Sequence, residues 1–139
     1  MRLKGLNCIV TGGSSGIGAA TVKRFVDEGA QVLIADIDID TANSFAEEMG
    51  SSVGAIKCDV RIEADVKAVS DHAYKTWGKV DVLVNNAGSE LNQTYDKTTL
   101  EEWDRVLDTD LKGPWLMCKY IVPGMVLSLI HISEPTRRL

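Results

Sequence analysis

Residues that could bind a phosphate group lie near the N-terminus, in the stretch 11–18 (TGGSSGIG), directly after the apolar run 8–10. Glycine has no Cβ, so a glycine-rich chain can turn sharply and approach an anion closely. The free N–H groups at the start of a following helix then favour the bound anion. We expect Gly12 to make the turn, Gly16 to allow the close approach and Gly18 to let the helix pack on the strand. The pattern therefore predicts a pyrophosphate-binding turn.

A carboxylate, Asp36, ends the apolar run 31–36. It follows the glycines by about 20 residues, the position at which a strand-end acid accepts hydrogen bonds from the ribose hydroxyls of a dinucleotide. The same charge would repel a 2′-phosphate, and no Arg or Lys lies among residues 12–18 or just after Asp36. The charge of Asp36 and the lack of a nearby Arg or Lys therefore favour NAD over NADP. The alternative is an ordinary solvated Asp at the end of a strand.

Polar groups also follow the next two apolar runs. Asp59 comes after the run 53–58, where its carboxylate could bind the amino group of adenine beside the Val60 amide, or could instead cap the following helix. The run 80–84, which we expect to be a buried strand, leads into Asn85-Asn86-Ala87-Gly88. Ligands of a doubly wound sheet bind outside the carboxyl ends of its strands. These groups are therefore expected to lie at one ligand-binding edge.

Helical patterns alternate with the strands. Apolar residues at three- and four-residue spacing predict helices over about 18–28, 40–49 and 63–77, each of which ends at a glycine. Strands that are apolar on both faces and alternate with helices are typical of an α/β fold with a parallel sheet.

A later helix has a clear start and an expected interruption. Thr99 and Glu102 have the spacing of a capping box. Pro114 suits the first turn of a new helix better than the middle of an old one, so we expect a break near residues 110–113.

The composition narrows the functional classes. A chain of 139 residues, 45% of them hydrophobic, has the size of one domain with a core. Its net charge of −5 provides no basic surface for nucleic acid or an anionic membrane. Pro123 and Gly124 interrupt the most apolar late stretch, which is too short to span a bilayer. The three cysteines lack metal-ligand spacing. We therefore expect a cytoplasmic protein that binds neither nucleic acid, membrane nor metal.

Taken together, these residues resemble the short-chain dehydrogenase/reductase family. The motifs that carry the resemblance, in the family's order, are Thr11-Gly12-x-x-x-Gly16-Ile17-Gly18, Asp36 after the second strand, Cys58-Asp59-Val60, Asn85-Asn86-Ala87-Gly88 and Asp108-x-Asp110-Leu111-x-Gly113. They cover residues 1–126, which we interpret as a partial NAD(P)-binding Rossmann domain. The resemblance implies a doubly wound parallel sheet with helices on both faces, here truncated to about four strands in the order 3-2-1-4.

The resemblance also implies an activity and a set of ligands. It implies hydride transfer between a nicotinamide cofactor and an alcohol or carbonyl substrate, in a full-length protein that forms homo-oligomers. A non-catalytic dinucleotide-binding or redox-sensing module is the alternative from another class. The residues that the resemblance assigns to the cofactor are Gly12, Ser14, Ser15, Gly16, Ile17, Gly18, Asp36, Ile37, Asp59, Val60, Asn86, Ala87 and Gly88.

Two features depart from the family. Asp110 stands where the family has an Asn that helps to hold a proton-relay water, and it adds a negative charge to that catalytic position. The family's catalytic Ser and Tyr-x-x-x-Lys pair are missing, since no tyrosine of this sequence has a lysine four residues later. The tyrosine acts as general acid and base, with a nearby ammonium lowering its pKa. We therefore expect the fragment alone to bind cofactor and to be inactive.

The C-terminal stretch is interpreted separately. Residues 127–137 (LSLIHISEPTR) resemble a translated transposon-type sequencing adapter, so we expect residues 127–139 to be a non-native tail in which His131 and Ser133 carry no function. The family's sheet continues beyond its fourth strand. We therefore expect residues 80–84 to form an exposed apolar edge and the fragment to be poorly soluble or partly folded.

Overall fold

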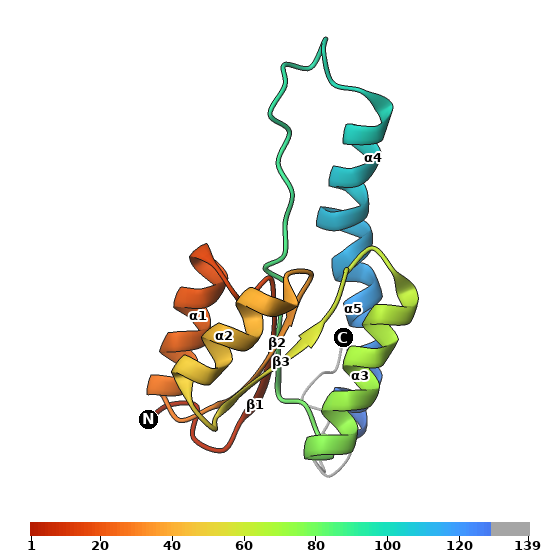
Figure 1. Ribbon diagram of the computed structural model, residues 1–139. Coiled ribbons are helices and arrows are strands. Elements are labelled where there is room, and N and C mark those ends of the chain that lie inside the picture. The colour runs from red at the N-terminus through yellow and green to blue at the C-terminus, as the bar shows by residue number, and fades with distance from the viewer. Residues whose placement is uncertain (129–139) are drawn as a thin grey trace.

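The computed structural model of the chain describes residues 1–128. The expected non-native tail, with His131 and Ser133, therefore lies almost entirely outside the described residues. Strands and helices alternate along the chain as the sequence predicts (Figure 1). The elements are β1 (Asn7–Thr11), α1 (Gly16–Asp27), β2 (Gln31–Asp36), α2 (Ile39–Met49), β3 (Val53–Lys57), α3 (Glu63–Trp77), β4 (Val82–Val84), α4 (Leu100–Leu107), the π-helical segment η1 (Asp108–Lys112) and α5 (Gly113–Ser128).

The four described strands form one parallel sheet in the order β3-β2-β1-β4, which confirms the predicted order. The strand β1 lies between β2 and β4, with Ile9 opposite Leu33 on one side and Leu83 on the other. Figure 1 shows α1 and α2 on one side of the sheet and α3 and α5 on the other. The fold is therefore doubly wound.

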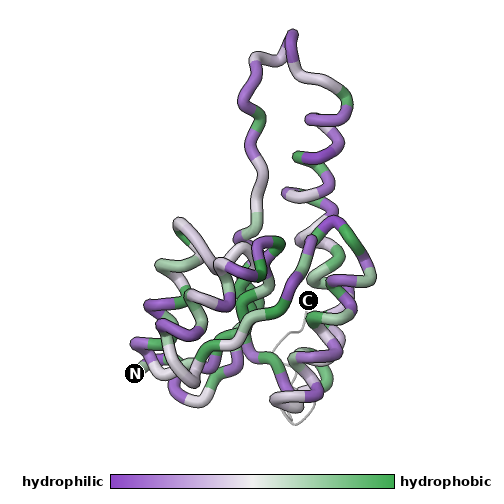
Figure 2. Tube along the Cα trace, in the orientation of Figure 1, coloured by the Kyte–Doolittle hydropathy of each residue, from purple (hydrophilic) through white to green (hydrophobic). Residues whose placement is uncertain are grey.

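The core has two halves, one on each face of the sheet. Successive side chains of a strand point to opposite faces. Ile9 accordingly packs in the cluster that contains Met117 of α5, while Val10 packs in the cluster that contains Val22 of α1. Every residue of β1 is buried because helices cover both of its faces. In Figure 2 the strands are largely hydrophobic, whereas α4 and the segment before it are mostly hydrophilic.

The fourth strand differs from the expectation. It spans only Val82–Val84, and its residues are half-buried rather than buried. The reason is that β1 is its one strand neighbour among residues 1–128. Val80 is buried, but it lies before the strand. The helix α1 also differs slightly, because it begins at Gly16 rather than at Gly18.

The interruption expected near residues 110–113 is a π-helical segment rather than a break in the helix, and Pro114 lies in the first turn of α5 as expected. The helix passes from α4 into α5 through η1, in which the N–H of Gly113 donates to the carbonyl of Asp108. Pro114 has no N–H for the usual bond to the fourth residue before it, and the wider π-helical turn absorbs this gap. The capping box of Thr99 and Glu102 at the start of α4 is confirmed.

Pro123 lies inside α5, and the helix runs on to Ser128 rather than stopping there. Two hydroxyls of α3 bond to this part of α5: Ser70 donates to the carbonyl of Tyr120, and Tyr74 donates to the carbonyl of Ile121 at 2.6 Å. These bonds attach α5 to α3 where the proline weakens its own hydrogen-bond ladder. None of the helices within residues 1–128 is long and apolar enough to cross a membrane.

The N-terminal segment is attached to the end of α1 through Glu28, and this contact predicts a pH dependence of stability. The Arg2 N–H donates to the Glu28 carboxylate at 2.8 Å and Arg24 donates at 2.6 Å, which lowers the pKa of Glu28 from 4.5 to about 2. A lowered folded-state pKa stabilises the protein above the unfolded value, and this contribution is lost as the pH falls through the folded value. We expect the stability difference between the native chain and Glu28→Gln to be constant above pH 4.5 and to shrink between pH 4.5 and about 2.

Urea unfolding at a series of pH values measures this difference. Glu48→Gln is the matched control, because Glu48 is an exposed helical glutamate whose side chain forms no hydrogen bond or ion pair within residues 1–128. A Glu28→Gln profile parallel to that of the control would contradict the interpretation.

Candidate functional site

A cleft of about 790 Å³ opens at the carboxyl edge of the sheet. Residues from the glycine turn, from the ends of β2, β3 and β4, and from the helix that carries η1 form its walls. All of the site residues predicted from the sequence line it except Ser14 and Gly18. The lining residues are Gly12, Ser15, Gly16, Ile17, Ala35, Asp36, Ile37, Cys58, Asp59, Val60, Arg61, Asn86, Ala87, Gly88, Ser89, Glu90, Arg105, Thr109 and Asp110.

The glycine turn needs glycine for two different reasons. Gly12 has a φ of +61°, and a Cβ there would lie 3.0 Å from the Cα of Ala87. A Cβ on Gly18 would overlap the carbonyl of Gly12 and lie 2.6 Å from the side-chain amide nitrogen of Asn86. Gly18 therefore lets α1 pack on the turn itself and on Asn86, not on the strand as expected.

Asn86 supports this turn from the neighbouring strand end. Its side-chain amide donates to the carbonyls of Thr11 and Gly12, at 3.1 and 3.0 Å. The hydroxyl of Thr11 in turn accepts the backbone N–H groups of Asn86 and Ala87, both at 3.0 Å. Asn86 lines the cleft as predicted, but both amide hydrogens are engaged by the protein. Its part in the structure is to hold the turn in place.

Asp36 is fixed in the wall of the cleft. The residue is only 7% exposed, and one of its carboxylate oxygens accepts both the N–H and the hydroxyl of Ser14, at 3.1 and 2.7 Å. The other oxygen accepts the N–H of Asp38 at 3.1 Å. Ser14, which the resemblance assigned to the cofactor, thus lies behind the wall and orients Asp36.

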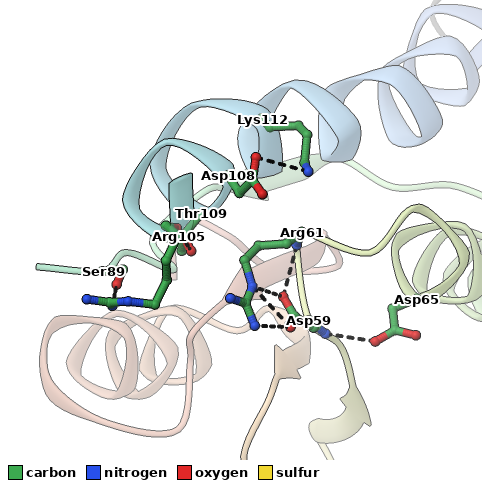
Figure 3. Close-up of polar contacts among 8 residues, drawn as sticks. All are labelled: Asp59, Arg61, Asp65, Ser89, Arg105, Asp108, Thr109 and Lys112. Carbon is green, nitrogen blue, oxygen red and sulfur yellow. Dashed lines mark hydrogen bonds and ion pairs between the residues drawn. The ribbon is translucent and has the colours of Figure 1, made fainter. Parts of the chain in front are cut away.

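Asp59 is paired with Arg61, as Figure 3 shows. The guanidinium bonds to the carboxylate through Nε and Nη2, which lowers the pKa of Asp59 and raises that of Arg61. The backbone N–H of Asp59 donates to Asp65 at 3.0 Å. The alternative that Asp59 caps the following helix is wrong, since Ile62 occupies the cap position of α3 and no side chain caps it.

Asp110 fixes the segment that follows β4. One of its carboxylate oxygens accepts the N–H of Ser89 at 2.8 Å. Arg105, from the same helix, bonds to the hydroxyl of Ser89 and donates to the carbonyl of Glu90 at 3.1 Å. An asparagine oxygen could accept the Ser89 N–H in the same way, so this contact does not require an aspartate.

Sequence reasoning missed seven lining residues: Ala35, Cys58, Arg61, Ser89, Glu90, Arg105 and Thr109. The sequence could have pointed to Arg61, because it is a cation two residues after the strand-end acid Asp59. No such signal existed for Arg105, because the position of its helix over the cleft is a tertiary feature. Cys58 is an inert part of the wall, since burial raises the pKa of its thiol to about 12.

The cleft fits a dinucleotide. Among the residues that the structure describes, no side chain caps the first turn of α1, so its N–H groups remain available to an anion. A Cβ on Gly16 would meet no atom within 4 Å, which leaves room for close approach. Asp36 supplies an acceptor for hydroxyl groups beside this anion site. Within residues 1–128 no cluster of three or more metal-ligating side chains occurs.

Comparison with known proteins assigns the chain to a family. The family model described as short chain dehydrogenase matches residues 7–130. The chain belongs to the short-chain dehydrogenase family. This finding confirms the resemblance seen in the motifs.

Relatives within the short-chain dehydrogenase family include enzymes of different names. The chain is 41% identical to momilactone A synthase of Oryza sativa subsp. japonica, over 99% of this chain and 48% of the relative. It is 35% identical to the 3-oxoacyl-(acyl-carrier-protein) reductase of Thermotoga maritima, over 96% of this chain and 57% of the relative. The chain thus spans about half the length of these relatives.

Solved structures of the family have the same fold. A 3-ketoacyl-(acyl-carrier-protein) reductase from Brucella melitensis, complexed with NADH, matches with a TM-score of 0.84 and 36% identity, over 88% of this chain and 51% of the other. A second short-chain dehydrogenase/reductase from Brucella melitensis matches with a TM-score of 0.87 and 26% identity, over 90% of this chain and 54% of the other. These matches confirm the Rossmann-type fold.

The contact between Gly18 and the turn predicts a large effect of one added methyl group. We expect Gly18→Ala to lower the free energy of unfolding by about 2 kcal/mol or more, because the methyl group overlaps backbone atoms that cannot move freely. Gly54→Ala is the matched control, since a Cβ there would lie 3.8 Å from its nearest neighbour. Urea unfolding compares the two variants, and equal stabilities would show that the close packing at Gly18 is unimportant.

Proposed function

We propose that residues 1–126 are the cofactor-binding part of an NAD-dependent oxidoreductase that transfers hydride to or from a small alcohol or carbonyl substrate. The observation that carries the proposal is the buried carboxylate of Asp36 in the wall of the cleft, next to the glycine turn and the uncapped start of α1. The NADH complex of the Brucella melitensis reductase, whose fold this chain shares, supports it. The net charge of −5 is consistent with a cytoplasmic enzyme that acts on small molecules.

Different parts of the cleft suit different parts of the cofactor. The glycine turn and the start of α1 would hold the pyrophosphate through Gly12, Ser15, Gly16 and Ile17. Asp36 would accept the ribose hydroxyls, and Ile37, Asp59 and Val60 would surround the adenine. The nicotinamide half would lie along Asn86, Ala87 and Gly88. When bound, the nicotinamide ring supplies the carbon that gives or takes the hydride, while Ser14 and Gly18 act by holding the walls.

The charge of Asp36 favours NAD over NADP. Two like charges 4 Å apart repel by about 4 kcal/mol at an effective dielectric constant of about 20. Ser14 and Asp38 hold the carboxylate on both oxygens, so it cannot easily turn away from a 2′-phosphate. No Arg or Lys of the glycine turn compensates the repulsion.

A titration of the intrinsic fluorescence of NADH and NADPH tests this proposal. We expect the chain to bind NADH at least about tenfold more tightly than NADPH, and Asp36→Ala to remove most of that preference by weakening NADH binding. Asp27→Ala is the control, because Asp27 is an exposed acid of α1 away from the cleft. Failure to bind either dinucleotide would refute the proposed function, and equal binding of both would refute the NAD preference.

The chain on its own is proposed to bind cofactor without turnover. No tyrosine in the sequence is followed by a lysine at the spacing of the family's catalytic pair. Asp110, at the position of the family's Asn, is engaged with the N–H of Ser89. We propose that Asp110 positions the wall of the nicotinamide half. The substrate and the proton-transfer groups belong to the complete protein.

The exposed apolar residues of α4, η1 and α5 support self-association. Leu100, Trp103, Leu107, Leu111 and Trp115 follow one another at three- or four-residue spacing and are all exposed. A continuous apolar stripe of this kind marks an interaction surface. We propose that it forms a homo-oligomer interface.

The stripe gives a prediction about assembly. The native chain is expected to elute in size-exclusion chromatography with light scattering as a species larger than a monomer, and Trp103→Glu to shift it toward the monomer because a charge is buried at the interface. Lys67→Glu, an exposed substitution on α3, serves as the control. If native chain and Trp103→Glu have the same mass, the stripe is not the interface.

A further inference from the structure

The helix α4 has little support from its own chain. In the part of the chain that the structure describes, none of its eight residues is buried, and neither is any of the five residues of η1. The first buried residue of this continuous helix is Gly113, at the start of α5. In Figure 1, α4 and the segment before it extend away from the sheet. Most helical stability in proteins comes from packing of an apolar face, so α4 lacks the usual support of a helix.

This helix nevertheless holds one wall of the cofactor cleft. Ser89 and Glu90 line the cleft, and Arg105 of α4 bonds to the Ser89 hydroxyl and to the Glu90 carbonyl. Asp110 of η1 accepts the N–H of Ser89 at 2.8 Å. Arg105 and Ser89 lie together in Figure 3. The position of this wall therefore depends on the position of α4.

The apolar stripe lies on the opposite face of the helix from Arg105. Arg105 is two residues from Trp103 and two residues from Leu107. Two residues correspond to a rotation of about 200° in an α-helix, so the two stripe residues point away from the wall that Arg105 holds. Trp103 is 53% exposed and Leu107 is 40% exposed. A partner that covered the stripe would therefore hold α4 without blocking the cleft.

The stripe is complementary to itself. At four-residue spacing its side chains read the same in both directions: Trp103, Leu107, Leu111 and Trp115. A twofold axis near Thr109 would pair each tryptophan with the other tryptophan of a second copy, and each leucine with the other leucine. A twofold interface requires the same patch on both subunits. The order of these residues therefore favours a second copy of this chain as the partner.

Charge favours an antiparallel pair of helices. The first turn of α4 carries Glu101 and Glu102, which would lie beside the same acids of the second copy if the helices were parallel. At the other end of the stripe, Lys119 pairs with Glu63 and has its Nζ 5.4 Å from the ring centroid of Trp115. An antiparallel pair separates the acids of the two copies and brings each set toward a lysine, which is the complementary arrangement.

We propose that two copies of the chain pair antiparallel through the apolar stripe, and that this pairing raises the affinity of the cleft for the dinucleotide. The inference rests on the proposed function. Pairing holds α4, and α4 holds Ser89 and Glu90. The wall is then ordered before the ligand arrives, so binding no longer includes the free energy of ordering it. Linkage requires the reverse effect as well, so bound NADH strengthens the pairing.

Titrations of NADH fluorescence at several chain concentrations test the coupling. Light scattering first locates the concentration at which half of the 139-residue chain is paired. We expect the dissociation constant for NADH to be about fivefold or more lower well above that concentration than well below it. Saturating NADH should move the midpoint of pairing to a lower chain concentration. Equal affinity at both concentrations would overturn the inference.

Variants separate the pairing from the wall. Trp103→Glu is expected to stay monomeric and to bind NADH with the weaker affinity at every concentration. Arg105→Ala should still pair but show a smaller dependence of affinity on concentration, because one link from α4 to Ser89 is lost. Lys67→Glu, an exposed substitution on α3, is the control and should keep the native dependence. A monomeric Trp103→Glu chain that binds NADH as tightly as the paired native chain would contradict the coupling.

Hydrogen exchange without NADH distinguishes this inference from the proposed function. The amides of Ser89 and α4 are expected to exchange at least about tenfold more slowly in the paired chain, while those of the buried strand β1 are unchanged. If exchange slows in this way but NADH does not bind, the proposed function fails and the effect on affinity fails with it. If NADH binds but the chain stays monomeric, only the pairing and its coupling are refuted, and a different partner covers the stripe.

Discussion

The close contact between the glycine turn and the end of β4 is the constraint on which the cleft depends. Thr11 and Gly12 receive the side-chain amide of Asn86, and Gly18 leaves room for that amide. These bonds join two strand ends that are far apart in the sequence but adjacent in the sheet. The turn, the start of α1 and the wall beyond β4 are therefore joined by direct contacts. A buried polar network of this kind is stable because each donor within it has an acceptor.

Three acidic side chains line the cleft, and hydrogen bonds from other groups of the protein hold each carboxylate in place. Asp36 accepts donors from Ser14 and Asp38, Asp59 accepts Arg61, and Asp110 accepts the N–H of Ser89. Each acid is oriented by groups of the protein, so little reorganisation is needed when a ligand arrives. Their partners differ, and this difference decides their roles. Asp36 is held by backbone and hydroxyl donors, whereas both oxygens of Asp59 bond to the guanidinium of Arg61.

The π-helical segment η1 brings the late helix to the cleft. Gly113, the first residue of α5, packs against Val60, where a Cβ would lie 2.7 Å from a methyl carbon of the valine. The wider turn carries Asp110 to Ser89 and keeps α4 and α5 in one continuous helix. Single π-helical turns often occur at functional sites. Here the turn connects the wall of the cleft with the apolar stripe of the same helix.

The sequence by itself determined the succession of strands and helices, the glycine turn and the acids at the strand ends. These features depend on local chemistry, since apolar periodicity, glycine and capping residues act within a few neighbours along the chain. The capping box of Thr99 and Glu102 is a clear case, because both partners lie on one helical turn. The family's motif order, recognised from the same residues, accounts for the strand order.

Only the tertiary structure decided which groups pair with one another at the edge of the sheet. It placed Ser14 behind Asp36 and Gly18 against Asn86, so that neither residue lines the cleft. It also paired Asp59 with Arg61. Where the sequence predicted a helix break, the structure has the π-helical segment η1. Sequence patterns could not settle these points, because a hydrogen-bonding group has several possible partners until folding brings one of them into position. The chemistry available at the cleft depends on that choice.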